Sequence, residues 1–143
     1  MNFNIEKHTI FKCLSGSQAY GMATPESDKD FRGVAIPPKE YFYGFLNRFE
    51  QAETKEPDEV IYDLRKFMSL AADCNPNIID LLFIPEDCIR KTSPYWEMVL
   101  AQREMFLSMK AKHTYSGYAL AQLKRIKSHR GWLLNPIKNQ PKR

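Results

Sequence analysis

Two carboxylates lie one residue apart in the sequence, at Asp28 and Asp30, with Lys29 between them. The stretch DFRGVAI is typical of a β-strand, and residues i and i+2 of a strand point to the same face of a sheet. Two adjacent carboxylates repel each other, and a divalent cation is the usual compensation. Because carboxylate oxygens are hard ligands, we expect Asp28 and Asp30 on this strand to bind Mg²⁺ or Mn²⁺.

A third carboxylate would complete a two-metal site, in which the ions lie about 3.5–4 Å apart and act on both the attacking and the leaving oxygen of a phosphate. Asp63 is the best candidate, because it ends a predicted strand, EVIYDL, that we expect to pair with the strand of Asp30. Its alternative role is the N-cap of the following helix. Asp58 and Glu59 are weaker candidates, since they lie in turn-like sequence next to Pro57.

A phosphate-binding turn is indicated at Gly16-Ser17, which a spacer of ten residues separates from Asp28. Glycine allows a tight turn and a close approach of the backbone, and Ser17 adds a hydroxyl donor. The backbone N–H groups that follow could begin a helix, which would favour an anion; Ser17 could equally be a simple helix cap. Arg32 lies two residues after Asp30, so it could contact either a phosphate or one of the acids.

The elements that would position these residues are strands and helices in the first part of the chain, followed by helices alone. The expected strands cover residues 8–14, 30–36 and 59–64, and the expected helices cover 18–20, 64–74, a segment opened by Asn75-Pro76, a segment opened by Ser93-Pro94, and 114–129. Residues 40–59 are expected to form a mixed connection. This order predicts an α+β (α/β) fold, a small mixed sheet with flanking helices. We divide it into a core over residues 1–92 and a helical, basic extension over 93–143, which could belong to the same single domain.

Composition narrows the class of protein. The chain has 143 residues, 43% of them hydrophobic, and no apolar run long enough for a membrane span. No secretory leader is evident, and three widely spaced cysteines favour neither disulfides nor a structural zinc site, so we expect a cytoplasmic protein.

Charge is distributed unevenly along the chain. The net charge is +4, yet no acid follows Glu104 while nine Lys or Arg do. Lys124, Arg125, Lys127 and Arg130 could therefore follow a nucleic-acid backbone, or could simply be a solvated helix surface. The neighbouring stripe of Leu120, Leu123 and Ile126 is expected to face the core.

Four motifs together resemble a known family. They are GSQAYG (16–21), SDKDFRG (27–33), YDLRKF (62–67) and NPN (75–77). They resemble the nucleotidyltransferases of the DNA polymerase β superfamily, and most closely the subgroup of predicted nucleotidyltransferases linked to RNA repair. The resemblance covers roughly residues 10–135. Lys29 departs from the superfamily, which usually has an apolar residue between the two acids, and members of the subgroup often continue with further helical sequence.

The resemblance implies an enzyme that transfers a nucleoside monophosphate from a nucleoside triphosphate such as ATP to an acceptor hydroxyl and releases pyrophosphate. It implies Mg²⁺ or Mn²⁺ on Asp28, Asp30 and Asp63, and nucleotide contacts from Gly16, Ser17, Arg32 and Lys66. An RNA 3′ end is the expected acceptor. The alternatives are transfer to a protein hydroxyl, or a nucleotide- or RNA-binding module with little catalysis.

Overall fold

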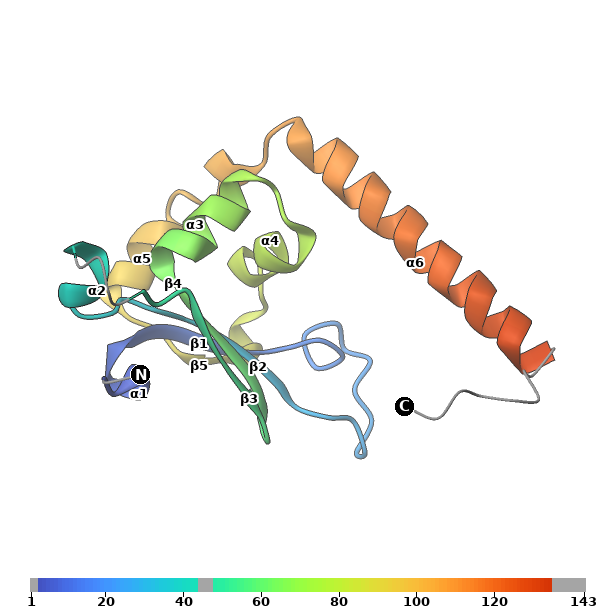
Figure 1. Cartoon of the computed structure of the whole chain (residues 1–143), viewed down its shortest axis with the longest axis horizontal. Helices are drawn as coiled ribbons and strands as arrows, with labels where there is room; N and C mark the ends of the chain where they lie inside the picture. The colour runs from blue at the N-terminus through green and yellow to red at the C-terminus, as the bar shows by residue number, and fades with distance from the viewer. Residues whose placement is uncertain (1–2, 44–47, 135–143) are drawn as a thin grey trace.

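The computed structural model describes residues 3–43 and 48–134 of the chain, with side chains described up to Arg130 (Figure 1). The described residues form a mixed α+β fold, as predicted. In chain order its elements are α1 (Ile5–His8), β1 (Thr9–Ser15), β2 (Asp30–Ala35), α2 (Glu40–Tyr43), β3 (Gln51–Lys55), β4 (Asp58–Asp63), α3 (Leu64–Ala72), α4 (Pro76–Leu82), η1 (Glu86–Cys88), β5 (Ile89–Lys91), α5 (Pro94–Leu100), η2 (Arg103–Phe106) and α6 (Lys110–Leu134).

The strands form one mixed sheet in the order β3-β4-β2-β1-β5. Only β2 and β4 run parallel, and the other neighbours are antiparallel. The three predicted strands are confirmed as β1, β2 and β4. Sequence reasoning missed the two edge strands, because β3 (QAETK) is polar and β5 has only three residues, so neither shows the alternation of a half-buried strand.

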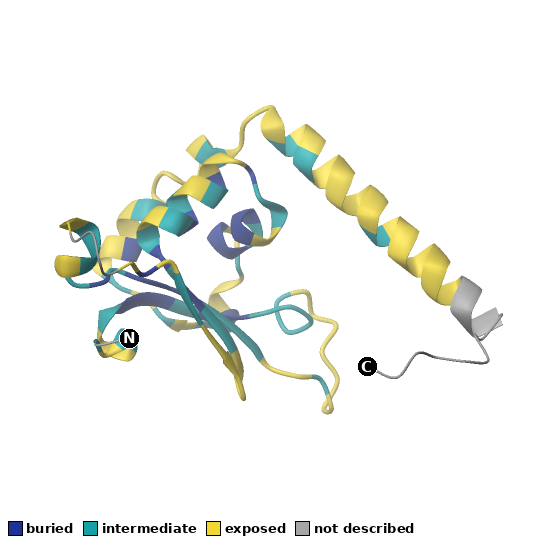
Figure 2. Ribbon diagram, in the orientation of Figure 1, coloured by how far each residue is buried: buried dark blue, intermediate teal, exposed yellow. Residues whose placement is uncertain are grey.

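The main core lies between one face of the sheet and helices α3, α4 and α5 (Figure 2). Phe11 of β1 stacks on Trp96 of α5 with ring centroids 4.1 Å apart, and Phe67 of α3 meets the same indole edge-on at 5.3 Å. All three rings are fully buried. Burial on this scale stabilises the fold by roughly 2–3 kcal/mol for each ring, and it fixes the helices over the sheet.

The starts of α4 and α5 follow the predicted capping chemistry. Asn75 accepts a hydrogen bond from the Asn77 backbone N–H at 3.1 Å, and Ser93 accepts one from that of Trp96 at 3.4 Å. A proline occupies the first turn of each helix, where its missing N–H costs nothing. These caps place the two helices where the sequence predicts them.

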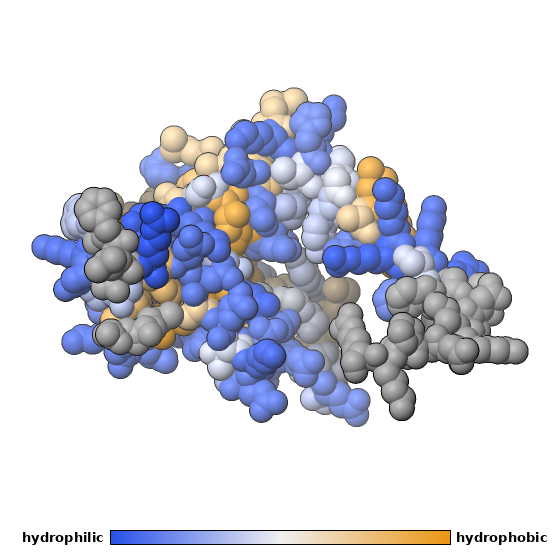
Figure 3. All heavy atoms as spheres, viewed as in Figure 1, coloured by the Kyte–Doolittle hydropathy of each residue, from blue (hydrophilic) through white to orange (hydrophobic). Residues whose placement is uncertain are grey.

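Helix α6 leaves the core as a long arm (Figure 1). Its first turns contact α4, through Tyr115 with Asp80, and Lys110 pairs with Asp73 at 2.9 Å. Beyond these turns it is mainly exposed, and apolar side chains along it lie among hydrophilic ones (Figures 2 and 3). Within residues 3–43 and 48–134, no helix combines the length and apolar character that a membrane span requires.

The exposure of α6 corrects one prediction. Leu120, Leu123 and Ile126 were expected to face the core, but they are 59%, 53% and 64% exposed. Helical spacing of apolar residues shows that they share one side of a helix, but it cannot show that anything packs against that side.

Candidate active site

The turn after β1 brings its backbone against an aspartate. Gly16 has a φ of +64°, and a Cβ placed on it would lie 2.5 Å from Oδ2 of Asp30. Only glycine combines this left-handed conformation with such a close approach. The residues that follow form consecutive turns, with the Tyr20 N–H donating to the Gly16 carbonyl at 3.3 Å and that of Met22 to the Ser17 carbonyl at 2.9 Å. The short helix expected over 18–20 is therefore absent, and the turn alone lies beside the carboxylate.

Asp30 is the first residue of β2. It lies opposite Ser15, whose hydroxyl donates to the Asp30 carbonyl at 3.3 Å. Asp28 does not belong to the strand as predicted; it is an exposed residue of the preceding loop. The negative charge of Asp28 still contributes to raising the pKa of Asp30, so the two acids lie near each other at the same edge of the sheet. Because Asp28 is outside the strand, its side-chain direction is set by the loop and not by strand alternation.

The carboxylate that joins Asp30 is Asp58, which sequence reasoning ranked below Asp63. Phe31 pairs with Glu59 in the parallel β2–β4 ladder, so Asp30 and Asp58 are the next neighbours along it. Burial, and the hydrogen bond shared with Asp58, raise the pKa of Asp30 above its ordinary value. Asp58 looked like a turn residue because it follows Pro57, but the β3–β4 turn closes at Glu56-Pro57 and Asp58 already pairs with Lys55.

Arg32 follows Asp30 by two residues in β2 and pairs with Val60 of β4. Its guanidinium donates from Nη1 to Oδ1 of Asp58 at 3.2 Å and to the Phe31 carbonyl at 2.8 Å. Of the two roles open in the sequence, contact with an acid is the one observed here. The guanidinium supplies the positive charge that two adjacent carboxylates require.

Asp63 lies at the other end of the sheet, and its predicted position beside Asp28 and Asp30 is wrong. It pairs with Ala35, five residues beyond Asp30 in β2, which is roughly 16 Å along the strand. The strands are neighbours as expected, but they run parallel, so the start of β2 and the end of β4 are at opposite edges. Asp63 also differs from Asp58 by an odd number of residues, which turns it to the other face of the sheet.

The surroundings of Asp63 are those of a structural residue. It is 2% exposed, caps the start of α3 by position, and accepts from Nε of Arg65 at 2.8 Å. Lys66, predicted to contact the nucleotide, lies on the same side and pairs with Glu50 at 3.4 Å. Both residues line a cavity separate from that of Gly16. The structure therefore separates Asp63 and Lys66 from the other predicted site residues.

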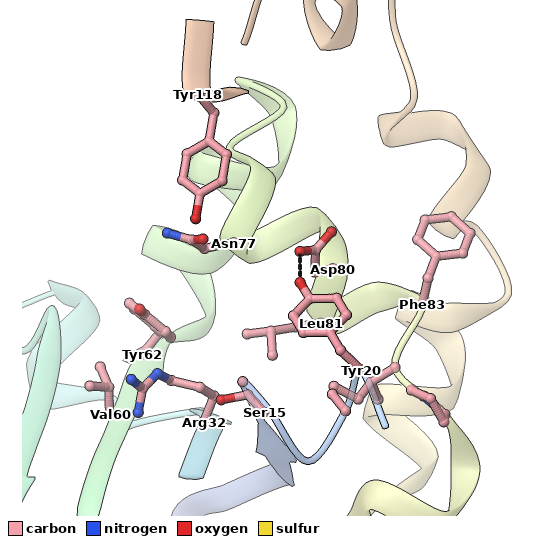
Figure 4. Close-up of a pocket in the computed structure, with 14 residues that line it drawn as sticks. Ser15, Tyr20, Arg32, Val60, Tyr62, Asn77, Asp80, Leu81, Phe83 and Tyr118 are labelled. Carbon is pink, nitrogen blue, oxygen red and sulfur yellow. Dashed lines mark hydrogen bonds between the residues drawn. The ribbon is translucent and has the colours of Figure 1, made fainter. Parts of the chain in front are cut away.

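A cavity of about 560 Å³ opens beside Gly16 and Arg32 (Figure 4). Its walls come from the sheet, from the Gly16 turn, from α4 with the segment after it, and from α6. The lining residues are Ser15, Gly16, Ala19, Tyr20, Arg32, Val60, Tyr62, Asn77, Asp80, Leu81, Phe83, Ile84, Pro85 and Tyr118. Its size suits a ligand of small-molecule dimensions. Sequence reasoning missed Asn77, Asp80 and Tyr118 as lining residues, although NPN was one of the motifs noted.

Among residues 3–43 and 48–134, no three Asp, Glu, His or Cys side chains are arranged to hold a metal ion. The chemistry of the donors nevertheless fits Mg²⁺ or Mn²⁺, because Asp28, Asp30 and Asp58 bring hard oxygen ligands to one edge of the sheet. The contact of Asp30 with the Gly16 turn and its shared hydrogen bond with Asp58 keep two of them together.

The predicted nucleic-acid residues lie on the exposed part of α6. Lys124, Arg125, Lys127 and Arg130 are all exposed. The same helix contributes Tyr118 to the cavity, so it connects the cavity with the basic surface.

Comparison with known proteins gives a family match and a similar phage protein. The sequence profile described as "RNA repair pathway DNA polymerase beta family" matches residues 3–135. The chain is 32% identical over 126 residues to an uncharacterized 38.9 kDa protein of enterobacteria phage T4, encoded in the nrdC-mobD intergenic region. This match covers 80% of the chain but 37% of the phage protein. No solved structure matches the chain.

Proposed function

The chain belongs to the RNA repair pathway DNA polymerase beta family, and from this premise we propose that it is a metal-dependent nucleotidyltransferase. It transfers a nucleoside monophosphate from a nucleoside triphosphate to an acceptor hydroxyl. The observation that carries this proposal is the pair of carboxylates Asp30 and Asp58, in neighbouring register on two parallel strands and directly against the Gly16 turn.

Asp28, Asp30 and Asp58 would hold the Mg²⁺ or Mn²⁺ ions. These ions, when bound, neutralise phosphate charge and lower the pKa of an attacking hydroxyl. The Gly16-Ser17 turn would hold the triphosphate close to the carboxylates, because the absence of a Cβ at Gly16 lets the turn lie directly against Asp30. Arg32 contacts Asp58 and lines the cavity, so its guanidinium can also donate a hydrogen bond to a phosphate oxygen.

The reaction is an in-line displacement. The acceptor oxygen forms a bond to the α-phosphorus while the bond from that phosphorus to the bridging oxygen breaks, and pyrophosphate leaves with the electron pair. The proton of the acceptor hydroxyl passes to one of the carboxylates of the site or to water. The chain's own contribution is positioning and electrostatic stabilisation, and no covalent enzyme intermediate is required.

An RNA 3′-hydroxyl is the acceptor we propose. The exposed basic residues of α6 match the charge of an RNA backbone, and α6 also reaches the cavity through Tyr118. The family description, which names an RNA repair pathway, points the same way.

The test is transfer of label from α-³²P nucleoside triphosphates to a short RNA with Mg²⁺ or Mn²⁺. We expect label on the RNA 3′ end, and a loss of at least about 100-fold in Asp58→Asn and Asp30→Asn, because each removes a metal ligand. Asp73→Asn is the matched control, since Asp73 is an exposed acid whose partner is Lys110.

The Asp63→Asn variant tests whether Asp58 or Asp63 is the third carboxylate of the site. We expect folded Asp63→Asn protein to keep transfer within a few fold of wild type, after correction for any loss of stability. A collapse of transfer in Asp63→Asn with full activity in Asp58→Asn would refute the assignment of Asp58. Label found on protein but not on RNA would move the acceptor to a polypeptide, and no transfer by wild type with any triphosphate would refute the proposed activity.

A further inference from the structure

The cavity beside Gly16 has two ends of different chemistry. One end is formed by Ser15, Gly16 and Arg32, next to the carboxylates Asp30 and Asp58. The other end is formed by α4 and α6, with Asn77, Asp80 and Tyr118, and carries an amide and aromatic rings (Figure 4). If the phosphates lie at the first end, as in the proposed function, the remainder of the nucleotide must extend toward the second.

Asn77 offers an unused hydrogen-bonding group at this second end. It lies in the first turn of α4, where its backbone N–H is taken up by the Asn75 cap. Its side-chain amide has no hydrogen bond with any residue that the structure describes. An amide presents one acceptor and two donors side by side, which matches the mixed donor and acceptor edge of a nucleobase.

Tyr118 provides an aromatic surface beside that amide. Its hydroxyl points toward Asn77 across the top of the cavity (Figure 4). Tyr118 lines the cavity and is 44% exposed, so part of this residue remains open to a ligand. Stacking of a base on an aromatic side chain contributes affinity without selecting among bases, because every base has a flat face.

Asp80 fixes the geometry of this end by holding two tyrosines. Its Oδ2 accepts from the hydroxyl of Tyr20, which belongs to the Gly16 turn, and its Oδ1 accepts from Tyr115 of α6 at 3.2 Å. Because Tyr118 follows Tyr115 by three residues on the same helix, the Asp80–Tyr115 bond sets the distance of Tyr118 from α4. Asp80 is thus a positioning residue, and both of its oxygens are already occupied.

We propose that this end of the cavity binds the base of the incoming nucleoside triphosphate, with Tyr118 as the stacking surface and Asn77 as the residue that selects the base. The proposal rests on the proposed function for the position of the phosphates. It assigns affinity and selectivity to different residues, and this division makes it testable.

The experiment measures kcat and KM of wild type, Asn77→Ala, Tyr118→Ala and Tyr118→Phe with each of the four nucleoside triphosphates and one RNA. We expect Asn77→Ala to reduce the preference for the best triphosphate over the next by about 10-fold or more, the size of one lost base contact. Tyr118→Ala is expected to raise KM about 10-fold for all four with kcat within about threefold, and Tyr118→Phe to remain close to wild type.

Matched controls remove the same kinds of group elsewhere. Gln102→Ala takes away an exposed amide outside the cavity, and Tyr95→Ala removes an exposed ring from α5. Both should leave the preference and KM unchanged. Circular dichroism and thermal melting of every variant verify that the fold is retained.

Three outcomes would overturn the proposal. The first is an unchanged preference among triphosphates in Asn77→Ala, and the second is an unchanged KM in Tyr118→Ala. The third is that Asn77→Ala alters the preference for the last nucleotide of the RNA while the preference among triphosphates stays the same. If wild type transfers no label, the proposed function fails, but calorimetric binding of the four triphosphates still decides this inference. Selective binding that Asn77→Ala abolishes supports it, and binding that is unselective or undetectable in wild type refutes it.

Discussion

At the scale of residues, the centre of the candidate site is the contact between Asp30 and Asp58. The two carboxylates occupy neighbouring positions on parallel strands, and Arg32 bonds to the second of them. Burial and the hydrogen bond with Asp58 raise the pKa of Asp30, which means that the folded chain resists placing both negative charges there. Such an arrangement costs stability and is expected where a bound cation or substrate compensates it.

This residue-scale picture predicts that divalent metal stabilises the protein. Mg²⁺ or Mn²⁺ should raise the midpoint of thermal unfolding of wild type, since a ligand that binds the native state at 100 times its Kd adds about 2.7 kcal/mol. Excess EDTA should reverse the shift. Differential scanning fluorimetry of wild type and Asp30→Asn measures it.

The amide variant supplies the contrast. Asp30→Asn relieves the repulsion with Asp58, so without metal it should be at least as stable as wild type, and metal should no longer shift its midpoint. Asp73→Asn should respond to metal like wild type. An equal metal shift in Asp30→Asn would contradict the assignment of Asp30 as a ligand.

At the scale of elements, the turn after β1 depends on the absence of a side chain at Gly16. Gly16 and Gly21 both have a left-handed backbone, with φ of +64° and +66°, so alanine is strained at either position. Only at Gly16 would the added Cβ meet another group, the Asp30 carboxylate at 2.5 Å; at Gly21 nothing lies within 4 Å. The two glycines therefore separate backbone strain from displacement of the acid.

We predict that Gly16→Ala and Gly21→Ala both lose roughly 1–2 kcal/mol of stability from the unfavourable φ. Gly16→Ala should in addition lose most of its metal-induced stabilisation and of its transfer activity, because Asp30 must move. Urea unfolding and the metal shift of the melting midpoint check this. Equal behaviour of the two variants would show that the turn does not depend on the close approach to Asp30.

At the scale of the whole molecule, α6 connects the cavity with a positively charged surface. Its first turns bond to α4, and its later turns carry the exposed Lys124, Arg125, Lys127 and Arg130. The acids of the chain all precede the helix, ending at Glu104. An RNA strand on this arm would be held by phosphate contacts, whose strength depends steeply on salt.

We predict that changing these four residues to Gln weakens RNA binding and lowers the slope of log K against log salt by about 0.7 for each lost phosphate contact. Fluorescence anisotropy at several salt concentrations measures both quantities. The matched control changes four other exposed residues, two Lys and two Arg, namely Lys7, Lys39, Arg48 and Arg90, to Gln. Equal weakening in both variants would indicate a response to net charge alone, with no binding surface on α6.

Local sequence determined the elements and their chemistry. The β-branched and aromatic residues of β1, β2 and β4, the caps Asn75 and Ser93, and the need for glycine at position 16 are properties of a few neighbouring residues, so they could be predicted from the sequence. The edge strands β3 and β5 could not, because a polar or very short strand takes its conformation from its partner. The motif resemblance likewise identified the family without any coordinates.

Tertiary structure decided which acids meet. Asp58 and Asp63 belong to the same strand, and only its parallel pairing with β2 places Asp58 beside Asp30 and Asp63 at the far edge and on the opposite face. Strand direction and register depend on the whole sheet, and a shift of one residue reverses the face of every side chain. The position of α6 likewise decides that Leu123 is exposed and that Tyr118 lines the same cavity as Asn77. Helical periodicity in the sequence does not specify where a helix lies in the fold.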